Sequence, residues 1–185
     1  MTARKIMLIR HAEKPTDAAQ GVSAAGQQDP EELIVRGWQR SGALARFFAP
    51  LSGTPLDPKL AQPQAIYASK VAKHSNSWRP QHTVLELSTL INVPLSTNFT
   101  KGDEKDLAPK LAGLTIPVLV AWEHQDIPTI VNDIVGNNTL CPQSWPGTRF
   151  DVVWVLDRAD DTSAWKFHQV PQMLLSGDSP DPIPF

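Results

Sequence analysis

A short apolar run near the start of the chain, residues 6–9, ends abruptly in Arg10 and His11. The run has the composition of a buried strand, and open α/β sheets bind their ligands at the carboxyl ends of strands. A neutral imidazole can attack phosphorus, and a neighbouring guanidinium can hold the phosphate under attack. An isolated Arg-His pair is more often a strand end whose charges face solvent, so the rest of the chain decides.

Apolar strands alternate with amphipathic helices along the sequence. Strands are predicted at residues 4–11, 65–69, 94–99, 116–122 and 150–156, and the alternating segment 165–170 predicts a half-exposed edge strand. Helices are predicted at residues 29–48, 76–91, 104–114 and 128–135, the first from Asp29 as cap, Pro30 and Glu32. This order predicts an α/β three-layer sandwich, with a mainly parallel central sheet flanked by helices and an antiparallel edge strand. We expect one domain over residues 1–185, in which 172–185 form a Pro-rich tail without regular structure.

Composition narrows the range of functions. The formal net charge of −2 is unlike the basic surface that binds nucleic acid, and no apolar run approaches the roughly 20 residues of a membrane span. Cys141 is the single cysteine, so no intrachain disulfide forms, and a cytoplasmic location is expected. We therefore expect neither nucleic acid nor a membrane as a partner, while the oligomeric state stays open.

Charged and histidine side chains follow several predicted strands. His11 follows the first strand, and His124 follows the strand at 116–122. In a parallel sheet both would emerge at one edge and share a pocket. Arg79 opens a predicted helix, whose N-terminus also favours an anion. Together these groups predict a site for a tetrahedral dianion.

Four motifs in order resemble the histidine phosphatase superfamily, which includes the phosphoglycerate mutases and acid phosphatases. Residues 8–13 (Leu-Ile-Arg-His-Ala-Glu) resemble its Arg-His-Gly-Glu signature, and residues 33–40 resemble the helix start that follows it. Residues 67–83 resemble its Ser-x-x-x-Arg-x-x-Gln-Thr segment, and residues 118–124 its Val-Ser-His-Gly strand end. Ser69 and Arg79 are further apart than in the family, so either a loop is inserted or Ser75 replaces Ser69.

The resemblance implies that His11 is a nucleophile that takes up a phosphoryl group, which water then removes. Arg10, Arg79 and His124 would surround the phosphate and stabilise charge on its oxygens. Substrate-binding roles are expected for Arg10, Glu13, Lys14, Ser75 and Arg79. For Glu13 a hydrogen-bonding role within the signature loop is the competing interpretation, and for Lys14 a solvated charge at the rim.

The resemblance leaves the proton donor for the leaving group open. Glu104 lies in the interval where mutase-like members carry a glutamate, although at a helix start where it could cap. Glu123 adjoins His124, but strand alternation would direct it to the other face of the sheet. Asp126 is the third candidate, since Gln125 occupies the place of the acid-phosphatase aspartate.

The function that this resemblance implies is a phosphatase that acts on a phosphomonoester or a phosphoprotein, without a metal or other cofactor. We expect phosphate or sulfate to occupy the same site. The alternatives are a phosphomutase and a non-catalytic module that binds phosphate or phosphohistidine. The mutase would need capping segments for which residues 79–124 leave little room, and a binding module would need the arginines but no nucleophile.

Overall fold

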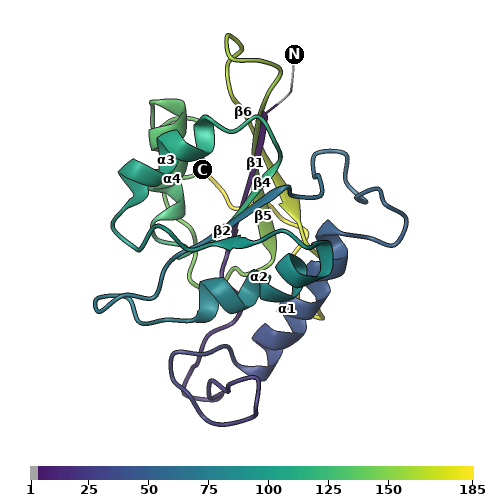
Figure 1. Ribbon diagram of the computed structural model, residues 1–185, viewed down its shortest axis with the longest axis vertical. Coiled ribbons are helices and arrows are strands. Elements are labelled where there is room, and N and C mark those ends of the chain that lie inside the picture. The colour runs from purple at the N-terminus through teal and green to yellow at the C-terminus, as the bar shows by residue number, and fades with distance from the viewer. Residues whose placement is uncertain (1–3) are drawn as a thin grey trace.

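Residues 4–185 are described by a computed structural model (Figure 1). Its strands are β1 (Arg4–Arg10), β2 (Ala65–Ala68), β3 (Leu95–Ser96), β4 (Val118–Trp122), β5 (Val152–Arg158) and β6 (Lys166–Pro171). Its helices are α1 (Val35–Phe48), α2 (Arg79–Ile91), α3 (Glu104–Ala112) and α4 (Ile127–Val135). Each predicted element is present, and the largest difference in position concerns the start of α1.

The strands form one sheet in the order β3-β2-β4-β1-β5-β6. The first four in that order run parallel, whereas β5 pairs antiparallel with β1, and β6 pairs antiparallel with β5. The predicted mainly parallel sheet with an antiparallel edge strand is thereby confirmed. Strands β1 and β4 are neighbours that end together, with Arg10 in register with Trp122.

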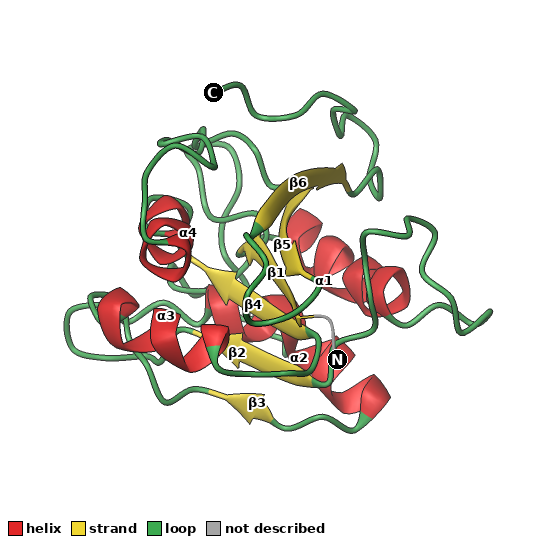
Figure 2. Ribbon diagram, turned by 90° about the horizontal axis from the view of Figure 1, so that it is seen from above, coloured by secondary structure: helices red, strands yellow, loops and turns green. Residues whose placement is uncertain are grey.

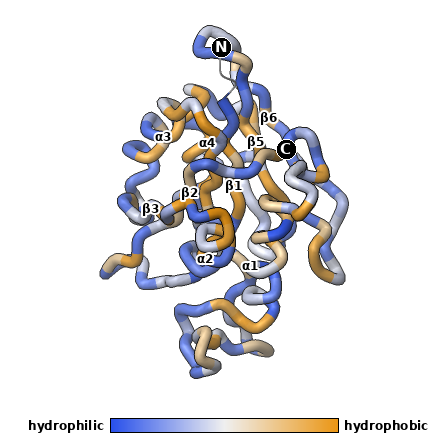
Figure 3. Tube along the Cα trace, turned by 45° about the vertical axis from the view of Figure 1, so that its right-hand side comes forward, coloured by the Kyte–Doolittle hydropathy of each residue, from blue (hydrophilic) through white to orange (hydrophobic). Residues whose placement is uncertain are grey.

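Helices cover both faces of this sheet. Successive side chains of a strand point to opposite faces. On β1, Met7 and Ile9 therefore join a core with residues of α1 and α2, whereas Ile6 and Leu8 join a core with residues of α3 and α4. Figure 2 shows the two helix pairs on either side of the strands, and Figure 3 shows apolar residues concentrated along the strands. Burial on both faces explains why these strands read as continuous apolar runs.

Helix α1 begins at Val35, so the prediction of a helix start at Asp29 was wrong. A side-chain oxygen of Asp29 does accept a hydrogen bond from the backbone N–H of Glu31 (2.8 Å), but the chain continues as a turn. The carbonyl of Pro30 accepts a hydrogen bond from the Arg79 guanidinium (2.9 Å). Contact with α2 thus overrides the local capping signal and holds this segment beside the helix.

Helix α2 begins at Arg79 rather than at residue 76, with Pro80 in its first turn, where a missing N–H costs no helical bond. Arg79 therefore lies at the helix start, as predicted.

The tail from residue 172 to 185 has no regular secondary structure, as predicted, but it packs closely on the sheet. The Ile183 side chain is fully buried, and its backbone N–H and C=O both bond the side chain of Gln169 on β6 (2.9 and 2.8 Å).

Candidate active site

The geometry of β1 and β4 brings the two predicted histidines to one edge of the sheet. The backbone N–H of His11 donates to the carbonyl of Trp122 (3.0 Å), which extends the pairing of the two strands by one bond. His124 follows Trp122 after one residue. The expectation that both histidines emerge at the same edge is confirmed.

The ring of His11 is held in one orientation and kept neutral. The residue is 5% exposed, and its Nδ1 lies 2.7 Å from the carbonyl oxygen of Ala12. A carbonyl oxygen can only accept a hydrogen bond, so Nδ1 carries the proton and Nε2 keeps its lone pair. Burial, reinforced by nearby Arg10, Arg79 and His124 but opposed by the Ala12 bond, lowers the pKa of His11 to about 3. At neutral pH this imidazole is therefore uncharged, and the lone pair of Nε2 stays available.

The guanidinium of Arg10 lies beside His11 with part of its hydrogen-bonding capacity unused. It stacks 3.7 Å above the ring of Phe150, and its Nη1 donates to the carbonyls of Gly147 (2.6 Å) and Arg149 (3.3 Å). Its Nε and Nη2 are buried and find no hydrogen-bond partner among residues 4–185. Burial lowers the pKa of Arg10 to about 10, which still leaves it positively charged at neutral pH.

Arg79 and His124 add two more unused polar nitrogens. Nε of Arg79 and Nδ1 of His124 are both buried without a hydrogen-bond partner in the described part of the chain. Burial, followed by the charge of Arg10, lowers the pKa of His124 to about 4. Unpaired buried donors are costly, and an anion in this position would satisfy those of Arg10 and Arg79.

The signature loop after β1 is tied to the start of α2. The backbone N–H of Ala12 donates to Oγ1 of Thr83 (2.8 Å), and that hydroxyl donates to the carbonyl of Arg79 (2.7 Å). The residues on either side of the site therefore share one fully buried threonine.

A pocket of about 180 Å³ opens onto His11. It is lined by His11, Glu31, Ser69, His74, Ser75, Asn76, Ser77, Arg79, Pro80, Lys101 and Glu123. Ser69 and Ser75 both belong to this lining, so the two serines that the sequence offered as alternatives lie at one pocket.

The three carboxylates considered from the sequence lie in different surroundings. Glu104 is buried beside Trp122, whose indole N–H donates to its Oε1 (2.9 Å), and it also accepts from the backbone N–H of Gly102 (3.1 Å). These two hydrogen bonds indicate a structural role for Glu104. Like Arg10 and His124, it does not belong to the pocket lining described above. Glu123 does line the pocket, but Oε2 is paired with Nζ of Lys101 (2.5 Å).

Asp126 lies near the same lysine (3.8 Å to Nζ) and outside the described lining. Burial, followed by the charge of Glu104, raises its pKa.

Glu31 is a pocket carboxylate that the sequence reasoning missed. The segment was interpreted as a helix start, where acidic residues are ordinary. No pattern in the sequence marks Glu31, because the start of α1 at Val35 is visible only in the structure.

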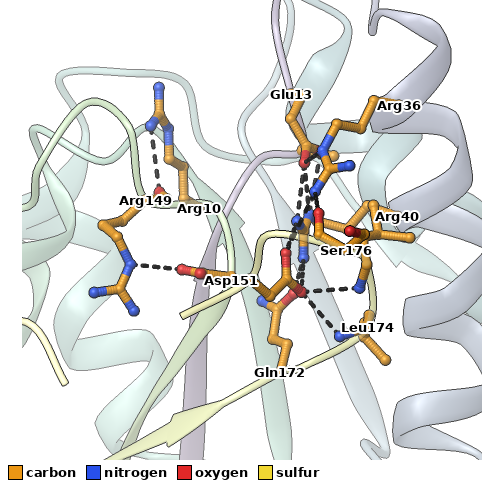
Figure 4. A network of polar contacts seen from close by, with 12 residues as sticks. Arg10, Glu13, Arg36, Arg40, Arg149, Asp151, Gln172, Leu174 and Ser176 are labelled. Atoms are coloured by element: carbon orange, nitrogen blue, oxygen red, sulfur yellow. Dashed lines mark hydrogen bonds and ion pairs between the residues drawn. The ribbon is translucent and has the colours of Figure 1, made fainter. Parts of the chain in front are cut away.

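Glu13 and Lys14 were expected to bind substrate, and the structure places neither in the pocket lining. Glu13 points to α1, where its carboxylate accepts hydrogen bonds from Arg40 (2.9 and 3.1 Å) and Arg36 (3.1 Å), as Figure 4 shows. This matches the competing interpretation, in which Glu13 holds the loop. Lys14 is exposed.

The network around Arg40 continues into the C-terminal tail. Its guanidinium donates to Asp178 (2.7 and 3.1 Å) and to the side chain of Gln172 (2.9 Å). Burial opposes ionisation of Asp178, but hydrogen bonds from Arg40 and from backbone N–H groups outweigh it and lower its pKa. The tail thus braces the signature loop through one buried arginine.

Within residues 4–185, no cluster of three or more His, Cys, Asp or Glu side chains is arranged to hold a metal ion. In the same range, the helices are all too short or too polar to cross a bilayer.

No protein-family model matches the sequence, and neither does a curated protein. Solved structures do resemble the fold. One is the mycobacterial glucosyl-3-phosphoglycerate phosphatase, with a TM-score of 0.54, 12% identity, and coverage of 89% of this chain and 97% of that chain. That phosphatase also has a structure in complex with VO3, with a TM-score of 0.53, 13% identity and coverage of 90% of this chain and 97% of that chain.

Another is a phosphoglycerate mutase from Bacillus anthracis, with a TM-score of 0.51, 10% identity, and coverage of 91% of this chain and 93% of that chain. The order of the strands, the helices on both faces and these likenesses agree with the resemblance seen in the four sequence motifs. The chain therefore shares its fold with these phosphatase and mutase structures.

Proposed function

We propose that this chain is a metal-independent phosphatase that hydrolyses a phosphomonoester through a phosphohistidine on His11. The observation that carries the proposal is the neutral, buried ring of His11. Its Nδ1–H is held by Ala12, and its Nε2 has no hydrogen-bond partner within residues 4–185. The charges of Arg10 and Arg79 act on this ring, and both residues have buried N–H groups without a partner in the described part of the chain. This combination suits attack on a bound phosphate.

In the first step, Nε2 of His11 attacks phosphorus and the bond to the ester oxygen breaks. The guanidinium groups of Arg10 and Arg79 stabilise the negative charge on the phosphoryl oxygens, and His124 is the third group proposed to do so. Donors of this kind are already in place before substrate arrives, and each contributes about 10²–10³ in rate. In the second step, water attacks the phosphohistidine and phosphate leaves.

The lining of the pocket supports a polar leaving group. Apart from Pro80, the lining residues given above are polar or charged, including three serines and an asparagine. Phosphorylated small molecules and the phosphorylated side chain of a protein both fit this chemistry. Because the similar mycobacterial phosphatase has a structure with VO3, we expect phosphate, sulfate or vanadate to occupy this site as well.

The test is hydrolysis of p-nitrophenyl phosphate in the presence of EDTA, for the wild type and for His11→Ala. We expect turnover by the wild type and at least a 10³-fold loss in the variant, in keeping with removal of a nucleophile. A circular dichroism spectrum and an unfolding curve for the variant control for loss of the fold. A folded His11→Ala variant with wild-type activity would show that another residue is the nucleophile. If the wild type did not hydrolyse p-nitrophenyl phosphate and the His11→Ala variant still bound phosphate, a non-catalytic binding module would be favoured.

A further inference from the structure

Two carboxylates of the described chain, Glu31 and Glu123, line the pocket that opens onto His11. They differ in their partners. Oε2 of Glu123 is 2.5 Å from Nζ of Lys101, which is close contact for an ion pair. Oε2 of Glu31 is 3.7 Å from Nη2 of Arg79, beyond hydrogen-bonding distance. Of the two carboxylates, Glu31 therefore has the weaker contact with a cation.

The main chain of Glu31 is fixed relative to the phosphate-binding arginine. Its carbonyl accepts a hydrogen bond from the backbone N–H of Trp78 (3.2 Å), and its own N–H donates to Asp29 (2.8 Å). The carbonyl of the preceding Pro30 accepts from Nη1 of Arg79 (2.9 Å). The backbone beneath the carboxylate is thus anchored on the start of α2. The carboxylate itself makes no hydrogen bond within residues 4–185, and its ion-pair contact in that range is the one with Arg79.

A bound phosphate changes the surroundings of Glu31 more than those of Glu123. The phosphate would take up free donors of Arg79, the same cation that faces Glu31. The bound dianion would therefore share with Glu31 the positive charge of Arg79. Glu123 keeps Lys101 as its own partner throughout.

We propose that Glu31 is a catalytic residue that protonates the leaving group, an assignment that rests on the proposed phosphatase function. In the first step, a P–N bond forms to Nε2 of His11, the P–O ester bond breaks, and the proton of the Glu31 carboxyl moves to the ester oxygen. In the second step, a water molecule attacks phosphorus. The water oxygen forms the new P–O bond, and the Glu31 carboxylate takes the proton that the water loses. The P–N bond then breaks, Nε2 regains its lone pair, and inorganic phosphate leaves.

The test compares two substrates with different needs for an acid. The p-nitrophenolate ion leaves without protonation, whereas the alkoxide of glycerol 2-phosphate does not. We expect Glu31→Gln to lower kcat/KM for glycerol 2-phosphate by about 10²–10⁴-fold, the usual contribution of a general acid. For p-nitrophenyl phosphate the loss should stay below 10-fold. Glu123→Gln is the matched control, and its effects on the two substrates should be equal.

Each other outcome overturns the assignment in a distinguishable way. An equal loss on both substrates in Glu31→Gln would mean that Glu31 only positions Arg79. A loss confined to glycerol 2-phosphate in Glu123→Gln would make Glu123 the acid. A wild type that hydrolyses neither substrate would overturn the proposed phosphatase function itself, and the role of Glu31 with it.

Discussion

Replacing Gly37 with alanine should destabilise the protein, while the same change at Gly42 of the same helix should not. A Cβ at Gly37 would lie 2.6 Å from the backbone oxygen and 3.1 Å from the backbone nitrogen of Glu13. A Cβ at Gly42 would meet no atom within 4 Å. Because Glu13 is part of the signature loop that carries His11, the clash at Gly37 falls on the backbone of the site.

The two variants share the gain in helix propensity, so their difference isolates the clash. Alanine is favoured over glycine in a helix by about 1 kcal/mol. Gly42→Ala should therefore raise the free energy of unfolding by up to about 1 kcal/mol. Overpacking costs typically about 1–3 kcal/mol. Gly37→Ala should consequently be less stable than Gly42→Ala by about 1–3 kcal/mol.

Urea unfolding followed by circular dichroism measures this difference, with the p-nitrophenyl phosphate assay run on the same samples. We expect Gly37→Ala to lose activity as well, since the backbone of Glu13 must move to admit the methyl group. A Gly37→Ala variant as stable and as active as Gly42→Ala would refute the close packing of α1 against the signature loop.

Three further predictions concern buried polar groups. Arg40→Met should lower the free energy of unfolding by about 3–5 kcal/mol in thermal or urea unfolding, because two buried carboxylates lose their shared cation. Arg36→Met should lower it by about 1 kcal/mol or less, because the Arg36 side chain is 40% exposed and that of Arg40 is 2% exposed. In His11→Asn, stability should fall less steeply with acid. Burial lowers the His11 pKa from 6.5 to about 3, so its contribution is present above pH 6.5 and lost as pH falls toward 3, by up to about 1.4 kcal/mol per pH unit. Unfolding curves at pH 7, 5 and 4 test this, and parallel pH dependences would contradict it. Thr83→Val should cost about 1–3 kcal/mol in urea unfolding by leaving the Ala12 N–H unsatisfied; a neutral change would show that this bond is dispensable.

Much of the sheet could be predicted from the sequence because its strands are buried on both faces. Residues 6–9 and 118–122 are continuous apolar runs, and such runs predict central parallel strands without any knowledge of their partners. The start of α1 could not be predicted in the same way. Asp29 does accept a hydrogen bond from the backbone N–H of Glu31, but no helix follows, and the contact of Pro30 with Arg79 holds the segment as a turn.

The site residues also differ in how well the sequence predicts them. Local patterns predict His11, His124 and Arg79, because each lies at a strand end or a helix start. Glu31 lies at the pocket because of a turn whose shape depends on tertiary hydrogen bonds. Hydrophobic periodicity in the sequence therefore could not predict its position. The bond from Arg40 to Asp178 joins residues far apart in the chain, and the tail that carries Asp178 reads only as Pro-rich.

The central claim is that His11 takes up the phosphoryl group, and trapping that intermediate tests it most directly. Wild-type protein would be mixed with p-nitrophenyl phosphate, quenched in alkali within milliseconds, and digested for mass spectrometry at neutral to alkaline pH, where phosphohistidine survives. We predict a phosphorylated peptide that contains His11, with the modification on the histidine, labile to acid and absent from His11→Ala. Turnover by the wild type with a phosphoryl group on another residue would contradict the account.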